Sequence, residues 1–319
     1  MNARLLEDRR PSNGAGHAPT DRLVVATRGL TRRFGDRIVV DSLDLEIPSG
    51  CIYGFLGPNG SGKSTTMKML LGLLRPTSGE VELFGERADD ATRNRLMPKI
   101  GSMIENPPGY SHLTGAENMR VVQRMLGLSE AQISRALDLV GLRGAKDKLR
   151  REYSLGMKQR LGIAMALARE PRLLVLDEPT NGLDPAGIEE IRELLIRLAS
   201  EGVTVMVSSH LLDEIDRMAS VLGILSAGRL VFQGSRRELL SRSLPDVVVA
   251  TPDPEGALAL VGGRREPGGI RLEGIDEAGV ARLVVALVGA GIPIHEVRRA
   301  PQSLEDVFMD LTKHEGALR

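Results

Sequence analysis

A glycine-rich stretch that follows a run of apolar residues has the types and spacing of a phosphate-binding loop. Residues 57–65 read G-P-N-G-S-G-K-S-T and fit the pattern G-x-x-x-x-G-K-[ST], the Walker A motif. Glycines let the backbone approach phosphate oxygens, and N–H groups of the loop and of the following helix point at them. We expect Lys63 to reach the β- and γ-phosphates and the Ser64 hydroxyl to ligate Mg²⁺. The residues expected to bind the nucleotide here are Gly57, Pro58, Asn59, Gly60, Ser61, Gly62, Lys63, Ser64 and Thr65.

Two acidic residues end a second apolar run further along the chain. Residues 172–178 read R-L-L-V-L-D-E, and a continuous apolar run of this kind is typical of a parallel strand buried on both faces. We expect Asp177 to hold Mg²⁺, directly or through water, and Glu178 to polarise the attacking water as a general base. A strand that ends in Asp-Glu is common, and alone it would favour a structural role. The phosphate-binding loop upstream favours catalysis.

A serine and a glycine precede a predicted helix between these two motifs. Residues 153–160 read Y-S-L-G-M-K-Q-R. Ser154 and Gly156 at the N-terminus of a helix form a site for an anion. The alternative is that Ser154 only caps the helix, which is its commonest role.

The elements that must position these residues alternate between strand and helix. Strands are expected at residues 23–26, 38–47, 51–56, 81–84, 100–104, 173–176, 203–207, 221–225 and 230–232, and helices at 65–74, 117–126, 130–140, 156–168 and 188–198. Ser129 is the expected N-cap of the third of these helices. The alternation predicts an α/β core with much parallel sheet.

Composition shifts divide the chain into three parts. Residues 1–22 are rich in Pro, Gly and polar residues and are expected to form a disordered tail. Residues 23–244 form the predicted α/β domain, and a boundary follows near Leu244-Pro245. Residues 245–319 are expected to form a small α+β accessory domain, with strands at 247–250, 269–272 and 294–297 and helices from 255, at 277–289 and at 303–312.

Bulk composition limits the classes of function. The chain has 319 residues, a formal net charge of zero and 3% aromatic residues, so no nucleic-acid partner is expected. Its one cysteine, Cys51, excludes an intrachain disulfide and a cysteine-based zinc site, and is typical of a reducing cytosol. No stretch approaches 18 uncharged apolar residues, so no membrane span is expected.

Five motifs occur in an order and spacing that resemble those of the ATP-binding-cassette (ABC) ATPases, specifically the nucleotide-binding subunit of a transporter. They are residues 57–65, 153–160 and 172–178, N-G-L-D at 181–184, and S-S-H at 208–210. The likeness covers about residues 23–240. It implies a P-loop NTPase core with antiparallel β and helical subdomains, ATP and Mg²⁺ as cofactors, and ATP hydrolysis.

The resemblance also implies that two such domains, as a homodimer or a heterodimer, associate head to tail around ATP. Ser154 and the Gly156 backbone would bind the γ-phosphate held by the other domain, and Asp184 would link the two sites. His210 would contact the γ-phosphate and orient the attacking water, although a lone histidine is more often structural. Phe34 occupies the position at which the family stacks adenine, with a place in the core as the alternative.

Glu105 departs from the family pattern. It ends the predicted strand 100–104, at a position where the family carries a glutamine that ligates Mg²⁺. A carboxylate can also ligate the metal, but it adds negative charge near the γ-phosphate and Glu178, which would raise a carboxylate pKa or alter metal affinity. The surrounding sequence is similar to ATPases of bacitracin-type and lantibiotic self-protection exporters, which tend to carry glutamate here. The alternative is that Glu105 has no metal role.

These observations together predict the ATPase subunit of an exporter, cytoplasmic and bound to the inner face of the membrane through a separate permease. The expected docking surface is residues 105–124, and the expected cargo is an antibiotic, a peptide or another drug. A lipid or another small molecule is the alternative cargo.

The sequence disfavours two other classes of function. A non-transport cassette ATPase that acts on nucleic acid or the ribosome is disfavoured, because the stretch between Lys63 and Ser154 is too short for coiled-coil arms. A regulatory module without catalysis is disfavoured because Lys63, Asp177, Glu178 and His210 are all in place.

Overall fold

A six-stranded sheet lies at the centre of the larger of two regions in the computed structural model, which describes residues 23–241, 245–300 and 304–313. The predicted tail, residues 1–22, lies outside the described residues. The sheet has the order β11-β10-β4-β9-β8-β7. All its pairs are parallel except β10 with β11. The strands are β4 (Ile52–Leu56), β7 (Ile100–Met103), β8 (Leu173–Asp177), β9 (Thr204–Ser209), β10 (Val221–Ser226) and β11 (Arg229–Gly234). The predicted α/β core with much parallel sheet is confirmed.

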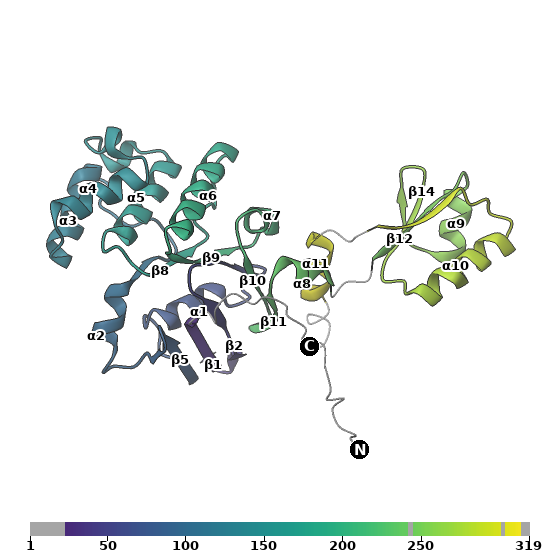
Figure 1. Ribbon diagram of the computed structural model, residues 1–319, viewed down its shortest axis with the longest axis horizontal. Helices are drawn as coiled ribbons and strands as arrows, with labels where there is room; N and C mark the ends of the chain where they lie inside the picture. The colour runs from purple at the N-terminus through teal and green to yellow at the C-terminus, as the bar shows by residue number, and fades with distance from the viewer. Residues whose placement is uncertain (1–22, 242–244, 301–303, 314–319) are drawn as a thin grey trace, which may run out of the picture.

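The two faces of this sheet pack into different cores, because successive side chains of a strand point to opposite faces. Leu174 and Leu176 of β8 pack with helices α3 (Gly115–Leu126), α4 (Glu130–Leu139), α5 (Leu155–Leu167) and α6 (Pro185–Ser200). Leu173 and Val175 pack instead with α1 (Lys63–Leu70). Figure 1 shows helices α3 to α6 on one side of strands β8 and β9 and α1 on the other.

A smaller antiparallel sheet covers the α1 side, as the resemblance implies. It has the order β2-β1-β5-β6, with β3 paired to β1, and its apolar residues share the core of α1. Its strands are β1 (Leu23–Phe34), β2 (Arg37–Leu43), β3 (Glu46–Pro48), β5 (Ser78–Leu83) and β6 (Glu86–Arg87). The predicted strand 38–47 is therefore two strands, interrupted at Asp44 and Leu45.

Short polar side chains begin the helices that carry or support motif residues. Thr114 and Ser129 form capping boxes on α3 and α4, which confirms the predicted cap at Ser129. Shorter helices complete this region: α2 (Arg93–Leu96), α7 (Leu212–Asp216), α8 (Arg236–Ser241) and the 3₁₀ turns Met97–Lys99, Arg143–Ala145 and Arg150–Glu152. Among the described helices, none has both the length and the apolar character needed to cross a membrane.

A second region, residues 246–300, has its own sheet and its own core. Four antiparallel strands have the order β13-β14-β12-β15, and two helices pack on one face around Val247, Val249, Ile270, Leu283 and Leu287. Figure 1 shows this region set apart from the larger one. Its elements are β12 (Asp246–Ala250), α9 (Pro254–Val261), β13 (Arg264–Glu266), β14 (Gly269–Leu272), α10 (Glu277–Gly289) and β15 (Glu296–Ala300). We call it the inserted domain.

The last helix, α11 (Leu304–Lys313), belongs to the larger region. It contacts α7, α8 and β10, and Leu304, Val307 and Phe308 lie in the core that also holds α5 and α6. The predicted accessory domain, residues 245–319, included this helix. In the structure residues 246–300 are an insertion between α8 and α11, and their first and last residues, Asp246 and Ala300, pair with each other.

Candidate active site

Two glycines of the Walker A loop occupy positions that a larger residue would not readily adopt. Gly60 and Gly62 have φ angles of 81° and 109°, in the left-handed region that favours glycine. A Cβ atom on Gly62 would lie 2.7 Å from the carbonyl oxygen of Val39. The Ser61 hydroxyl is buried and has no hydrogen-bond partner among the described residues. A phosphate oxygen would satisfy this hydroxyl, so the loop fits the nucleotide that its sequence predicts.

Lys63 is held inside the loop rather than in solvent. Its Nζ donates to the carbonyl oxygens of Gly57 at 2.7 Å and Pro58 at 3.4 Å, and only 5% of the residue is exposed. Burial lowers the pKa of Lys63, and the nearby Glu178 carboxylate opposes that shift. An anion in the loop would compensate the buried ammonium group.

Three of the four predicted catalytic residues meet at the Glu178 carboxylate. Its Oε1 lies 3.6 Å from Lys63 Nζ, and its Oε2 lies 3.0 Å from His210 Nδ1. The three side chains come from the start of α1 and from just beyond the ends of β8 and β9. Glu178 has a φ angle of 48°, a strained conformation for a side chain larger than glycine. Such strain occurs where the surrounding structure fixes a functional carboxylate.

Ser208 joins the two strands that carry these residues. Its hydroxyl donates to Asp177 Oδ1 at 2.6 Å and accepts from the Glu178 backbone N–H at 2.9 Å. Asp177 and Ser208 are partners in the parallel register of β8 and β9. The motifs assign Ser208 no role of its own, because only the register of two strands that are distant in the chain reveals this contact.

The residues expected to bind Mg²⁺ are suited to a metal ion that also has phosphate oxygens of the nucleotide as ligands. No cluster of three or more His, Cys, Asp or Glu side chains that could hold a metal occurs in the described ranges. Ser64 and Asp177 are therefore too few for an all-protein cage. Mg²⁺ is commonly bound by one or two protein groups together with substrate phosphates and water.

Glu105, the fourth predicted catalytic residue, is paired with a lysine. Lys68 Nζ lies 2.5 Å from Glu105 Oε1, and Lys68 is one helical turn after Ser64. Glu105 has a φ angle of 66°, and 63% of its side chain is exposed. The added negative charge that the sequence predicts at this position is thus balanced by a cation from α1.

The signature residues cap helices within this one chain. Ser154 Oγ accepts from Met157 N–H at 3.2 Å, and Asp184 Oδ1 accepts from Gly187 N–H at 3.0 Å. Gly156 lies in the first turn of α5. Because α5 and α1 pack against opposite faces of the sheet, the structure does not bring Ser154 and the Walker A loop together in one copy.

Phe34 lies at the end of β1 and is 47% exposed, so it is not a core residue. The guanidinium carbon of Arg32 lies 4.4 Å from the ring centroid. An exposed ring supported by a cation is available to stack with a planar base.

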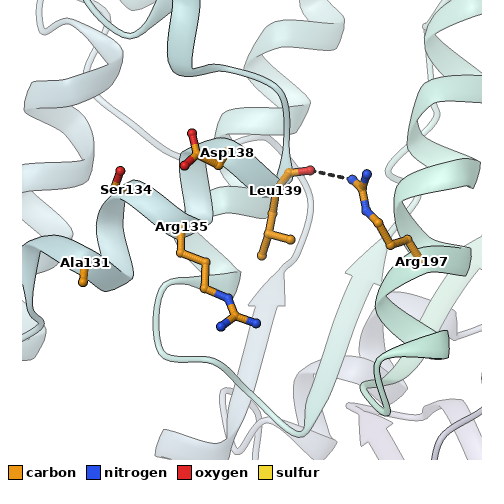
Figure 2. A pocket seen from close by; sticks show the side chains of 6 residues that line it. All are labelled: Ala131, Ser134, Arg135, Asp138, Leu139 and Arg197. Carbon is orange, nitrogen blue, oxygen red and sulfur yellow. Dashed lines mark hydrogen bonds between the residues drawn. The ribbon is translucent and has the colours of Figure 1, made fainter.

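A surface cleft between α4 and α6 is separate from these motifs. Figure 2 shows it with its lining residues Ala131, Ser134, Arg135, Asp138, Leu139 and Arg197, none of which is a predicted site residue. Arg197 donates to the carbonyl oxygen of Leu139 at 2.7 Å and so joins α6 to the end of α4.

Comparison with known proteins decides the family. The chain is 40% identical over 297 residues to the bacitracin transport ATP-binding protein BcrA of Enterococcus faecalis, across 90% of this chain and 96% of that protein. It belongs to the ABC transporter ATP-binding proteins. The profile of the family described as ABC transporter matches residues 40–181.

Other members of the family are similar in sequence or in fold. The chain is 45% identical over 206 residues to the lantibiotic transport ATP-binding protein SrtF of Streptococcus pyogenes, across 65% of this chain and 88% of that protein. A structure of cbiO1 from Clostridium perfringens, part of the ABC transporter complex cbiONQ, superposes with a TM-score of 0.64. It is 28% identical and covers 69% of this chain and 92% of cbiO1. The predicted family, fold, ATP binding and ATPase class are confirmed.

Proposed function

We propose that this ABC transporter ATP-binding protein powers an exporter that removes antibiotic peptides from the cell. The relatives named for bacitracin and lantibiotic transport support this cargo class, and the bacitracin relative is similar across nearly the whole chain. The observation that carries the catalytic part is the meeting of Lys63 and His210 at the Glu178 carboxylate.

The arrangement supports direct hydrolysis of ATP by water. Glu178 is placed to accept a proton from the attacking water, and His210 holds this carboxylate and orients the water. Lys63 and the N–H groups of the Walker A loop bind the phosphates. Ser64 and Asp177 would hold Mg²⁺, with Glu105 as a further ligand if it leaves Lys68. When bound, the metal neutralises phosphate charge.

We further propose that the active unit is a homodimer of this chain. The Walker A loop lies at the α1 side of the sheet, whereas Ser154 and Gly156 begin α5 on the other side. One copy alone therefore leaves the γ-phosphate without its signature contacts. In a head-to-tail pair Ser154 and Gly156 of each copy would complete the site of the other, and Asp184 would lie between the two sites.

A separate permease would complete the transporter, with this subunit on the cytoplasmic face of the membrane. The proposed docking surface, residues 105–124, includes the loop that ends in the cap of α3. Asn118 fixes this loop: its side chain accepts from Tyr110 N–H at 2.7 Å and donates to the carbonyl oxygens of Tyr110 and Thr114. Tyr110 itself is 56% exposed, which leaves its ring available for a partner.

The test of cargo is protection of living cells. The chain is expressed with a candidate permease in a strain sensitive to bacitracin and to a lantibiotic. We expect the wild-type pair to raise the inhibitory concentration of at least one of them, and the Glu178→Gln pair to raise neither. Active ATP hydrolysis without protection would overturn the peptide cargo.

A second cargo class has support from one comparison. The chain is 37% identical over 303 residues to the Nod factor export ATP-binding protein I of Cupriavidus metallidurans, across 92% of this chain and 98% of that protein. This relative is named for the export of another cargo, and a lipid or another small molecule is the alternative cargo for this chain. Cargo-stimulated ATP hydrolysis by the pair in lipid vesicles, with peptide or lipid added separately, discriminates between the two classes.

A further inference from the structure

A partly buried carboxylate links two loops of the active site that are far apart in the chain. Glu214 lies in α7, four residues after His210. Its Oε2 accepts hydrogen bonds from Thr180 Oγ1 at 2.6 Å and from Ser209 Oγ at 3.1 Å. Thr180 and Ser209 are 5% and 2% exposed. Because both donor residues are buried, their hydroxyl groups would lose their hydrogen-bond partner without this acceptor.

Each donor is adjacent to a catalytic segment. Thr180 follows Glu178 after a single proline, which has a fixed φ angle, and it begins the loop that leads to Asp184. Ser209 directly precedes His210, and its hydroxyl also accepts from the Leu211 N–H at 2.9 Å. Ser209 therefore fixes the backbone on both sides of the histidine.

The contacts close a ring. Three links are hydrogen bonds: Glu178 Oε2 lies 3.0 Å from His210 Nδ1, and Glu214 accepts from both Ser209 and Thr180. The other links are covalent, because Ser209 precedes His210 and Pro179 connects Thr180 to Glu178. Displacing any one segment of a closed ring displaces the others. The segment that carries His210 and the loop from Thr180 to Asp184 are thus joined by the side chain of Glu214, through Ser209 on one side and Thr180 on the other.

We propose that Glu214 is a positioning residue that makes the His210 segment and the loop from Thr180 to Asp184 move as one unit. This inference rests on the proposed ATP hydrolysis in a dimer. In that dimer a shift of the Asp184 loop against the second copy would set the distance between His210 and Glu178. Closure of the pair and alignment of the catalytic groups would then occur together.

The neighbouring acidic residue in α7 offers a matched comparison. Asp213 has the same charge as Glu214 but is exposed to solvent and lies outside the ring. The test therefore uses Glu214→Leu and Thr180→Val, which remove the acceptor and one donor, and Asp213→Leu as the control. Glu214→Gln and Thr180→Ser keep an acceptor oxygen and a hydroxyl at the same places.

Three quantities are measured for each variant: the rate of phosphate release at saturating MgATP, the affinity for MgATP in a Glu178→Gln background, and the midpoint of thermal unfolding. We expect Glu214→Leu and Thr180→Val each to lower kcat about ten-fold, as when a hydrogen bond made by a buried hydroxyl group is lost. The affinity should change by less than about two-fold, and the double variant should be no slower than either single one. Glu214→Gln, Thr180→Ser and Asp213→Leu should stay near the wild-type rate.

Separate results would overturn the inference and the proposed function. Wild-type protein that neither binds MgATP nor releases phosphate contradicts the proposed function. A wild type that turns over, with Glu214→Leu and Thr180→Val at the same rate, contradicts only the role of Glu214. Additive losses of kcat in the double variant also contradict the role of Glu214. So does a loss of kcat that is accompanied by weaker MgATP binding or by a lower unfolding midpoint, since these changes indicate a merely structural residue.

Discussion

Both regions of the molecule bury charged side chains, but they surround them differently. In the inserted domain Asp246 is fully buried and Arg271 binds both Asp246 and Glu266 on the sheet face opposite the helices. The bond to Glu266, with that to Asp246, raises the pKa of Arg271. Around Glu178 in the larger region, the partners come from α1 and from the loop after β9, and Ser61 keeps a buried hydroxyl without a partner among the described residues.

These surroundings distinguish a network that stabilises the fold from one that takes part in catalysis. The Arg271 network satisfies its groups within neighbouring strands of one sheet and needs no ligand. The Glu178 network joins segments distant in the chain, holds a strained backbone and leaves groups that a nucleotide would complete. Substitutions in the two regions are therefore expected to affect different properties.

The largest expected effect is that of Glu178→Gln. Removal of a general base should lower the rate of phosphate release by about 10²–10⁴-fold. Binding of MgATP should persist, because Lys63 and the Walker A loop are unchanged. Single-turnover hydrolysis and equilibrium binding of labelled ATP measure the two quantities. A variant that keeps its turnover would remove Glu178 from the chemistry.

A pair of core truncations should separate the two regions in stability. Phe308→Ala in α11 and Leu287→Ala in α10 remove buried side chains that are 7% and 0% exposed, at an expected cost of about 2–5 kcal/mol each. Phe308→Ala should lower the unfolding midpoint of the transition that MgATP shifts. Leu287→Ala should lower another transition and leave phosphate release unchanged. Calorimetry with and without MgATP checks this, and a single transition lowered by both variants would contradict the separation.

A smaller effect is expected from the pair of Lys68 and Glu105. Because 34% and 63% of the two side chains are exposed, the pair should contribute less than about 1 kcal/mol to stability. Lys68→Gln leaves the Glu105 charge unbalanced one turn from Ser64, so it should shift the Mg²⁺ concentration needed for ATP binding by about three-fold at most. In a Glu105→Gln background the same substitution should have no such effect. An equal shift in both backgrounds would show that the lysine acts independently of Glu105.

The smallest effect is expected from removal of the inserted domain. Asp246 and Ala300 are paired neighbours, so a short Gly-Ser linker can replace residues 246–300 and still join α8 to α11. Hydrolysis should stay within about two-fold of the intact chain, as for other insertions at the surface. Steady-state phosphate release checks this. Loss of activity in a folded variant would mean that the inserted domain takes part in the ATPase cycle.

The sequence was sufficient where a function depends on contiguous residues. The Walker A loop, the two acids at the end of β8 and the caps at Ser129 and Ser154 are local patterns, and the structure shows the expected elements there. The helix predicted at residues 303–312 is likewise found, as α11. The sequence did not show which region this helix joins, because the inserted domain lies between α8 and α11 in the chain.

The sequence patterns did not predict contacts between segments that are distant in the chain. Glu214 binds Thr180, 34 residues away, and Glu105 pairs with Lys68, 37 residues away. Both contacts depend on how the strands are ordered in the sheet, and in neither case does the spacing of the two residues carry a signal. Ser154 and Asp184 were found by their motifs, but the nucleotide site that they are proposed to complete or connect involves a second copy of the chain.

Two copies of this chain are proposed to close around MgATP, and light scattering on the size-separated Glu178→Gln protein, with and without MgATP, measures whether they do. We expect a monomer without nucleotide and with MgADP, and a dimer with MgATP that Ser154→Arg prevents. A protein that binds MgATP to saturation and remains a monomer would contradict it.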